Sequence, residues 1–246
     1  MSSPAGLWET LLSAVSRTAP PPVTSVELIL AIVAAAALSV PRRSWKYLGL
    51  LTTAAHELGH AFAAVTSGQR LSAIHLRLDH SGTTTTYSRS KAATVWSCFW
   101  GYPVPAVVGA AFVLCGFHGW GPASIAAGAA ALASTLVFLR NPAGFLITAA
   151  AIAGALALLL LVPGGFIGHV AVALGLALLV GAVRDLVKLV HVHLRRRSRL
   201  ATSDAYILYR ATSVPSGIWI FLFMTAVGGA WALAIQPVAA VLSAGA

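Results

Sequence analysis

The sequence predicts an all-α integral membrane protein with six or seven transmembrane helices and a small β-hairpin. Three observations lead to this fold class. Of the 246 residues, 58% are hydrophobic and only 9% are charged, whereas an average soluble domain carries about 25% charged residues. The apolar residues fall into long runs, close to the roughly 20 residues that a helix needs to cross a bilayer. Between two of these runs, apolar and polar side chains alternate, which indicates strands.

The N-terminal segment, residues 1–22, is expected to lie apart from a single membrane domain that covers residues 23–246. It has no positively charged region at its start, so we do not expect a cleaved signal peptide. It ends in three consecutive prolines. A disordered segment and a short helix lying on the membrane are both compatible with this composition.

Seven apolar segments are candidate transmembrane helices. The first is marginal in length and ends before Arg42, Arg43 and Lys46, which is why the expected number is six or seven. Gly101 and Pro103 are expected to break or bend the third. In chain order the candidates are Val23–Val40, Tyr47–Thr66, Ala92–Phe117, Pro122–Leu139, Ala143–Val162, Phe166–Val190 and Val214–Ile235.

The hairpin is expected over Arg70–Tyr87, directly after the second candidate helix. Between residues 74 and 79 apolar and polar side chains alternate with a period of two. The sequence Asp79-His80-Ser81-Gly82 has the composition of a turn. The residues that follow, Thr83–Tyr87, are β-branched or aromatic, as is typical of a strand.

The net charge of +10 is best explained by membrane topology. Lysines and arginines concentrate in the short polar gaps between apolar runs, and such residues mark the cytoplasmic side of a membrane protein. We therefore expect the loops at 67–91, 140–142 and 191–213 to face the cytoplasm of a multi-pass protein of the cell membrane. A soluble face with interleaved basic and aromatic residues is absent, so nucleic acid is not an expected partner.

The second candidate helix carries the sequence His56-Glu57-Leu58-Gly59-His60. Residues four apart share one face of a helix, so both imidazoles can bind a single zinc ion. Glu57 lies about 100° further round the helix and could accept a proton from water whose pKa the metal lowers. Ionisable residues are costly within an apolar segment and usually have a function there. We therefore interpret this helix as a zinc site.

A hydrolytic zinc ion usually has three protein ligands and a water, so a third ligand is needed. Asp204 is the leading candidate among the few acidic residues, but Ser203 followed by Asp204 also has the pattern of a helix start. Asp185 is interpreted as an ion-pair residue beside Arg184. Cys98 is interpreted as a small buried hydrophobic residue.

These motifs together resemble the site-2 protease class of intramembrane zinc metallopeptidases, and within it the bacterial M50B-like branch. Residues 56–61, HELGHA, match the family motif, and Gly101-Tyr102-Pro103 is similar to the start of the family's next helix. Ser203-Asp204-Ala205 resembles the segment in which typical members have Leu-Asp-Gly, whose Asp is the third zinc ligand. The resemblance implies Zn²⁺ held by His56, His60 and Asp204, with Glu57 as the catalytic residue.

The function implied by the resemblance is hydrolysis of peptide bonds in membrane-anchored proteins, within the lipid bilayer. An alternative is a non-catalytic membrane protein of the same fold that contains zinc and binds or regulates other proteins. A metal transporter is a poorer match, because segments 122–139 and 143–162 contain no acidic residue and no histidine. Transport would require polar ligands along several helices.

Overall fold

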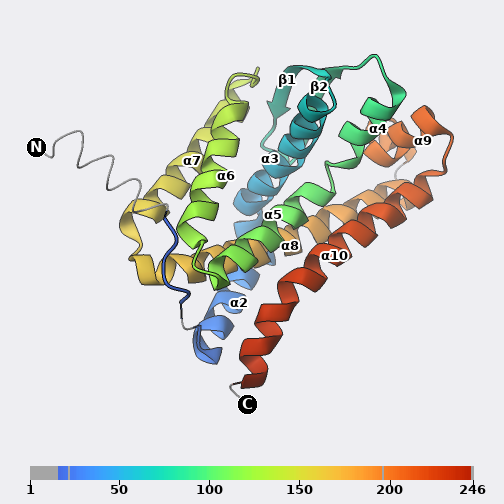
Figure 1. Cartoon of the computed structure of the whole chain (residues 1–246). Coiled ribbons are helices and arrows are strands. Elements are labelled where there is room, and N and C mark those ends of the chain that lie inside the picture. Colours follow the sequence, from blue (N-terminus) through green and yellow to red (C-terminus); the bar gives the residue numbers. More distant parts are fainter. Residues whose placement is uncertain (1–15, 22, 196, 245–246) are drawn as a thin grey trace, which may run out of the picture.

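The computed structural model describes residues 16–21, 23–195 and 197–244. It is mainly helical, with one two-stranded sheet near the end of the molecule that also holds α4 and α9 (Figure 1). The elements are α2 (Ser25–Ser39), α3 (Arg42–Thr66), β1 (Arg70–Leu76), β2 (Gly82–Tyr87), α4 (Lys91–Phe99), α5 (Pro103–Phe117), α6 (Gly121–Thr135), α7 (Pro142–Leu161), α8 (Gly164–Arg195), the 3₁₀-helix η1 (Arg197–Thr202), α9 (Asp204–Thr212) and α10 (Ser216–Ala244).

Most of the expected N-terminal segment, residues 1–15 and 22, lies outside the described part of the chain. The described remainder runs along the loop between α5 and α6. There the Thr18 amide donates a 2.9 Å hydrogen bond to the Gly119 carbonyl, and the Arg17 guanidinium lies over the Trp120 ring.

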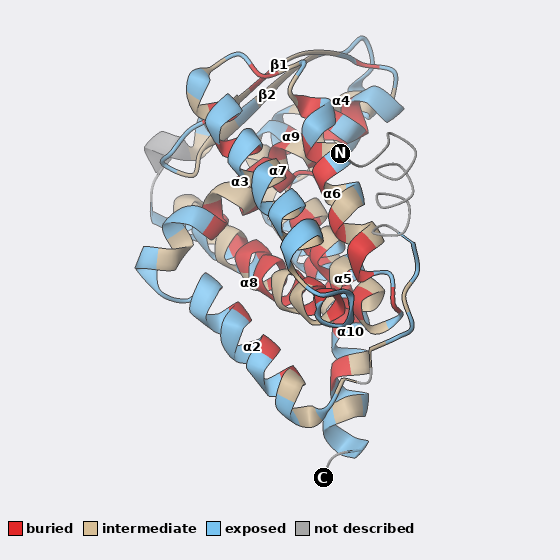
Figure 2. Ribbon diagram, turned by 90° about the vertical axis from the view of Figure 1, so that its left-hand side faces the viewer, coloured by how far each residue is buried: buried red, intermediate tan, exposed pale blue. Residues whose placement is uncertain are grey.

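Helix α8 forms the centre of the bundle and packs against α5. Small residues bring the two backbones together: a Cβ at Gly109 would meet the Gly175 carbonyl, and one at Gly116 would meet the Gly168 carbonyl. Glycine at such positions allows the close helix contacts by which membrane proteins gain packing energy. Buried residues accordingly concentrate along α8 and α5, whereas α2 is largely exposed (Figure 2).

The protein is a multi-pass membrane protein. Among the described residues, three helices, α7, α8 and α10, are long and apolar enough to cross a membrane, and there are up to five candidate spans if each of two bent helix pairs counts as one. Only 17% of the most apolar window of α7 is buried inside the protein, against 67% for α8. The exposed apolar faces of α7 and α10 therefore require lipid around them.

The number of spans differs from the six or seven apolar segments expected, for two structural reasons. Helices α2 and α3 meet at 90° and are counted together as one broken span. Helix α6 has only 15 residues, fewer than a straight crossing needs. The expected break in the third segment is confirmed, because α4 and α5 meet at 50° around Gly101.

The break between α2 and α3 corrects the expectation that Arg42, Arg43 and Lys46 lie in a loop. Helix α3 begins at Arg42, so these residues belong to its first turns. The break occurs at Pro41, which lacks the amide hydrogen needed to continue α2 but suits a helix start.

Arg184 of α8 stabilises the bend between α2 and α3. Its guanidinium donates hydrogen bonds to the carbonyls of Ser39 and Val40 and lies over the Trp45 ring, 4.1 Å from the centroid. It thereby satisfies the last carbonyls of α2, which have no partner within the helix. The ion pair expected of Asp185, which lies between Arg184 and Lys188 in the sequence, is absent from the described residues.

The expected hairpin is confirmed. Strands β1 and β2 pair in antiparallel fashion from Arg70 opposite Tyr87 to Leu76 opposite Gly82. In the turn, the Asp79 carboxylate accepts hydrogen bonds from the amide and hydroxyl of Ser81.

The other edge of β1 is covered by the segment that precedes α7. The Ile74 amide donates to the Phe138 carbonyl at 2.8 Å, and the Arg140 amide donates to the Ile74 carbonyl at 3.1 Å. The Asn141 side chain bonds both backbone groups of Leu76. The hairpin is therefore anchored to the membrane bundle.

Candidate metal centre

Two histidines of the HExxH sequence lie on one face of α3. The helix is continuous from Arg42 to Thr66, so His56 and His60 are separated by about one turn. Their ring centroids are 4.7 Å apart, and their Nε2 atoms approach to 3.1 Å.

Asp204 reaches the two histidines from a distant part of the chain. Its Oδ2 lies 3.2 Å from His56 Nε2 and 3.3 Å from His60 Nε2. It is also the first residue of α9, with Ser203 as the N-cap, so the two interpretations of this residue are compatible. The α9 backbone starts a helix while the side chain points to the histidines.

The spacing of these three atoms fits a metal ion. Zinc–nitrogen and zinc–oxygen distances of about 2.0–2.1 Å place tetrahedral ligand atoms about 3.3 Å from one another. The observed separations are 3.1, 3.2 and 3.3 Å. The three side chains are only 12–15% exposed, so they are held in these positions by the surrounding helices.

The hydrogen bond of His60 Nδ1 leaves the other ring nitrogen available to a metal ion. Its Nδ1 lies 2.8 Å from the Ser97 carbonyl oxygen, which can only accept, so Nδ1 carries the proton. In a neutral imidazole the other nitrogen, Nε2, then presents a lone pair. That lone pair faces the Asp204 carboxylate oxygen, and either a proton or a metal cation between the two atoms removes their repulsion. Histidines that bind a metal through one ring nitrogen usually donate a hydrogen bond from the other nitrogen, as His60 Nδ1 does to the Ser97 carbonyl.

A comparison with known families agrees with this geometry. The family model described as Peptidase M50B-like matches residues 29–234. The chain belongs to the M50B-like peptidase family. Neither a curated protein nor a solved structure gives a significant match. Family membership indicates that this M50B-like peptidase is a metallopeptidase with a protein substrate.

The junction between α4 and α5 encloses the candidate metal site of this M50B-like peptidase, which His56, His60 and Asp204 form. Gly101 packs directly against the histidines: a Cβ there would lie 2.8 Å from His56 Nε2 and still closer to the His60 ring. The Tyr102 ring meets the His56 ring edge-on at 4.7 Å. The Gly-Tyr sequence therefore leaves room for the two histidines and packs against one of them.

Cys98 contacts the third potential ligand, which the sequence did not reveal. The residue is 8% exposed, as expected for a small buried residue. In addition, its thiol donates to Asp204 at 3.6 Å from the backbone oxygen and 3.7 Å from Oδ1. No motif marks this role, because it depends on α4 and α9 packing side by side.

Glu57 lies next to the cluster but contributes none of the three clustered atoms. It is 5% exposed, and its Oε2 accepts a 2.6 Å hydrogen bond from the Thr84 hydroxyl of β2. A Cβ at Gly82 would collide with its carboxyl group. Strand β2 thus fixes the position of this carboxylate, a contact that the sequence did not predict.

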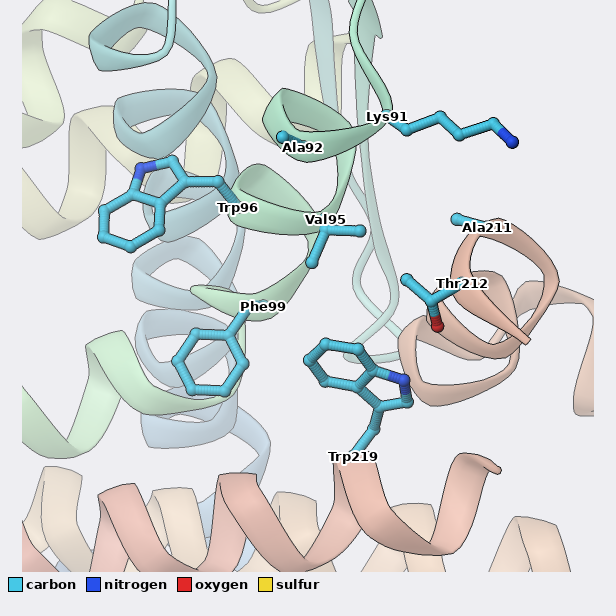
Figure 3. Close-up of a pocket in the computed structure, with 8 residues that line it drawn as sticks. All are labelled: Lys91, Ala92, Val95, Trp96, Phe99, Ala211, Thr212 and Trp219. Atoms are coloured by element: carbon cyan, nitrogen blue, oxygen red, sulfur yellow. The ribbon is translucent and has the colours of Figure 1, made fainter. Parts of the chain in front are cut away.

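An apolar groove of about 560 Å³ opens on the other side of α4, towards α9 and α10 (Figure 3). Phe99 and Trp219 approach each other from α4 and α10, with ring centroids 6.5 Å apart. Lys91 extends from the α4 end of the groove. Since Ser97 and Cys98 of the same helix contact His60 and Asp204, α4 separates this groove from the candidate metal site. The lining residues are Lys91, Ala92, Val95, Trp96, Phe99, Ala211, Thr212 and Trp219.

Proposed function

We propose that this M50B-like peptidase is an intramembrane zinc metalloprotease that hydrolyses peptide bonds of membrane-anchored proteins. One observation carries the proposal: a buried carboxylate, Glu57, lies beside three atoms with the spacing of zinc ligands without being one of them. A purely structural zinc site is usually closed by four protein ligands and needs no adjacent base.

The proposed roles follow from the contacts. His56, His60 and Asp204 would hold the zinc ion, which when bound lowers the pKa of water and polarises the substrate carbonyl. Glu57 accepts the proton of the attacking water and delivers it to the leaving amine. The Thr84 hydroxyl holds the Glu57 carboxylate in place.

Two features support a membrane-anchored substrate. The groove in Figure 3 has an almost wholly apolar lining and is one helix away from the cluster. The sheet has two strands, and β1 is covered on its far side by residues 138–140, which leaves the outer edge of β2 unpaired within the sheet. An extended substrate segment could add to that edge as a further strand, close to Glu57.

Zinc content tests the metal site. We expect close to one zinc per chain in the detergent-purified wild type and in Glu57→Gln, and a marked loss in Asp204→Ala. A wild type that contains no zinc after preparation without chelators would contradict the proposal. Full zinc in Asp204→Ala would show that another residue is the third ligand.

Cleavage tests the catalytic role separately. Membranes from cells that express the wild type should contain new N-termini, within or beside membrane segments, that are missing from cells that express Glu57→Gln. If both proteins bind zinc and give identical sets of N-termini, the non-catalytic alternative is favoured.

A further inference from the structure

A second groove, of about 780 Å³, lies between the hairpin and the segment before α7. Three arginines line it: Arg70 at the start of β1, Arg89 just beyond β2, and Arg140 two residues before α7. Apolar and aromatic side chains, among them Tyr87, Val137 and Phe138, complete the lining together with Leu71 and Ser72.

The positive charge of this groove is not neutralised by the protein. None of its lining residues is acidic, and every ion pair found among the described residues involves a histidine rather than an arginine. Arg140 donates to the carbonyls of Val137 and Leu139, which holds its guanidinium in place. The guanidinium groups of Arg70 and Arg89 make no hydrogen bond to other described residues, so their donors are free for a ligand.

The groove adjoins the start of α7, one of the helices whose exposed apolar side chains need lipid around them. Arg140 is two residues from the start of α7, which has exposed apolar side chains in its first turns, with Leu146 at 64%. The hairpin is held at the same height by its backbone bonds to residues 138–140, as the upper ends of these elements in Figure 1 show. Val137 and Tyr87 are 71% and 65% exposed, which suits the boundary between acyl chains and water.

We propose that this groove binds the head group of an anionic phospholipid. The phosphate would lie between Arg70, Arg89 and Arg140, and the upper part of the acyl chains would contact Val137 and Phe138. Arginine suits phosphate because its planar guanidinium can donate two parallel hydrogen bonds. Basic pockets on the cytoplasmic side of membrane proteins recognise lipid head groups in this way.

An acidic peptide is the main alternative occupant, and the lining argues against it. A peptide ligand would need backbone partners, yet the edge of β1 that faces away from β2 is already bonded to residues 138 and 140. The exposed Val137 beside three cations instead matches a molecule with an anionic head and an apolar tail. The proposal concerns a surface outside the metal cluster, so it does not depend on the proteolytic function.

Native mass spectrometry of the detergent-purified protein tests the proposal. The probes are phosphatidylglycerol, phosphatidylcholine, glycerol 1-phosphate and a hexaglutamate peptide. The test variant is Arg70→Gln/Arg89→Gln, which leaves Arg140 to hold its loop. The matched control is Arg42→Gln/Arg43→Gln, which removes the same charge from exposed positions at the start of α3. Thermal unfolding of each variant verifies that it is folded.

We expect the wild type and the control to retain phosphatidylglycerol in preference to phosphatidylcholine. The test variant should bind phosphatidylglycerol about thirtyfold more weakly, the effect of removing two cations near an anionic lipid. An equal loss in both variants would show unspecific charge attraction and overturn the proposal. Competition by glycerol 1-phosphate as strong as that of the lipid would assign the groove to soluble phosphates, and displacement by hexaglutamate at lower concentration would assign it to acidic peptides.

Discussion

Gly101→Ala tests whether the junction of α4 and α5 preserves the geometry of the three proposed metal ligands, His56, His60 and Asp204. The new Cβ would lie 2.8 Å from His56 Nε2 and closer to the His60 ring. A relaxed contact between such atoms is about 3.5 Å, so His56 would have to move by about 0.7 Å. Ligand distances in a zinc site are defined to about 0.2 Å. The substitution should therefore disturb the cluster even if the fold adapts.

We expect the zinc affinity of Gly101→Ala to fall by about 10–100-fold, the range seen when residues around metal ligands are changed. The measurement is competition with a chromophoric zinc chelator, in detergent. Gly154→Ala is the matched control, because a Cβ at Gly154 in α7 meets no atom within 4 Å, and alanine favours a helix. Wild-type zinc affinity in a folded Gly101→Ala protein would refute the reasoning.

Three further predictions concern residues around the site and the α2–α3 break. Cys98→Ala should lower zinc affinity by up to about tenfold, since Asp204 loses a donor, and Cys98→Ser should recover part of it; equal affinities in chelator competition would contradict this role. Thr84→Val should leave zinc content unchanged but slow cleavage of a membrane substrate by about tenfold, because Glu57 loses the hydroxyl that positions it; Thr84→Ser should restore the rate, and an unaltered rate in Thr84→Val would exclude the role. Arg184→Met should destabilise the protein by about 2 kcal/mol, because the Ser39 and Val40 carbonyls lose a charged donor. Thermal unfolding followed by tryptophan fluorescence measures this, with the exposed Arg210→Met as control, and equal midpoints in the two variants would contradict it.

The elements that the sequence predicted well are those defined by neighbouring residues. The hairpin over Arg70–Tyr87 follows from alternation and a turn within 18 residues. The break at Gly101 follows from glycine and proline in an apolar run. The common face of His56 and His60 follows from helical periodicity alone.

The predictions that differ from the structure concern residues whose positions depend on contacts between distant segments. Arg42 was expected to end a helix, yet it begins one, because Pro41 and Arg184 together stabilise a right-angled break. Asp185 was expected to form an ion pair, but its neighbour Arg184 contacts the end of α2 and Lys188 contacts the His80 carbonyl. Competition between partners of this kind cannot be judged from spacing along the chain.

By itself, the sequence determined the class of the protein, its HExxH helix and its hairpin, because hydrophobicity and short-range periodicity act through adjacent residues. Only the tertiary structure decided that Asp204 joins His56 and His60, and that Thr84 holds Glu57. It also decided that three separate arginines meet in one groove. These arrangements depend on how helices and strands pack in three dimensions, and that packing is a property of the whole chain rather than of any one segment.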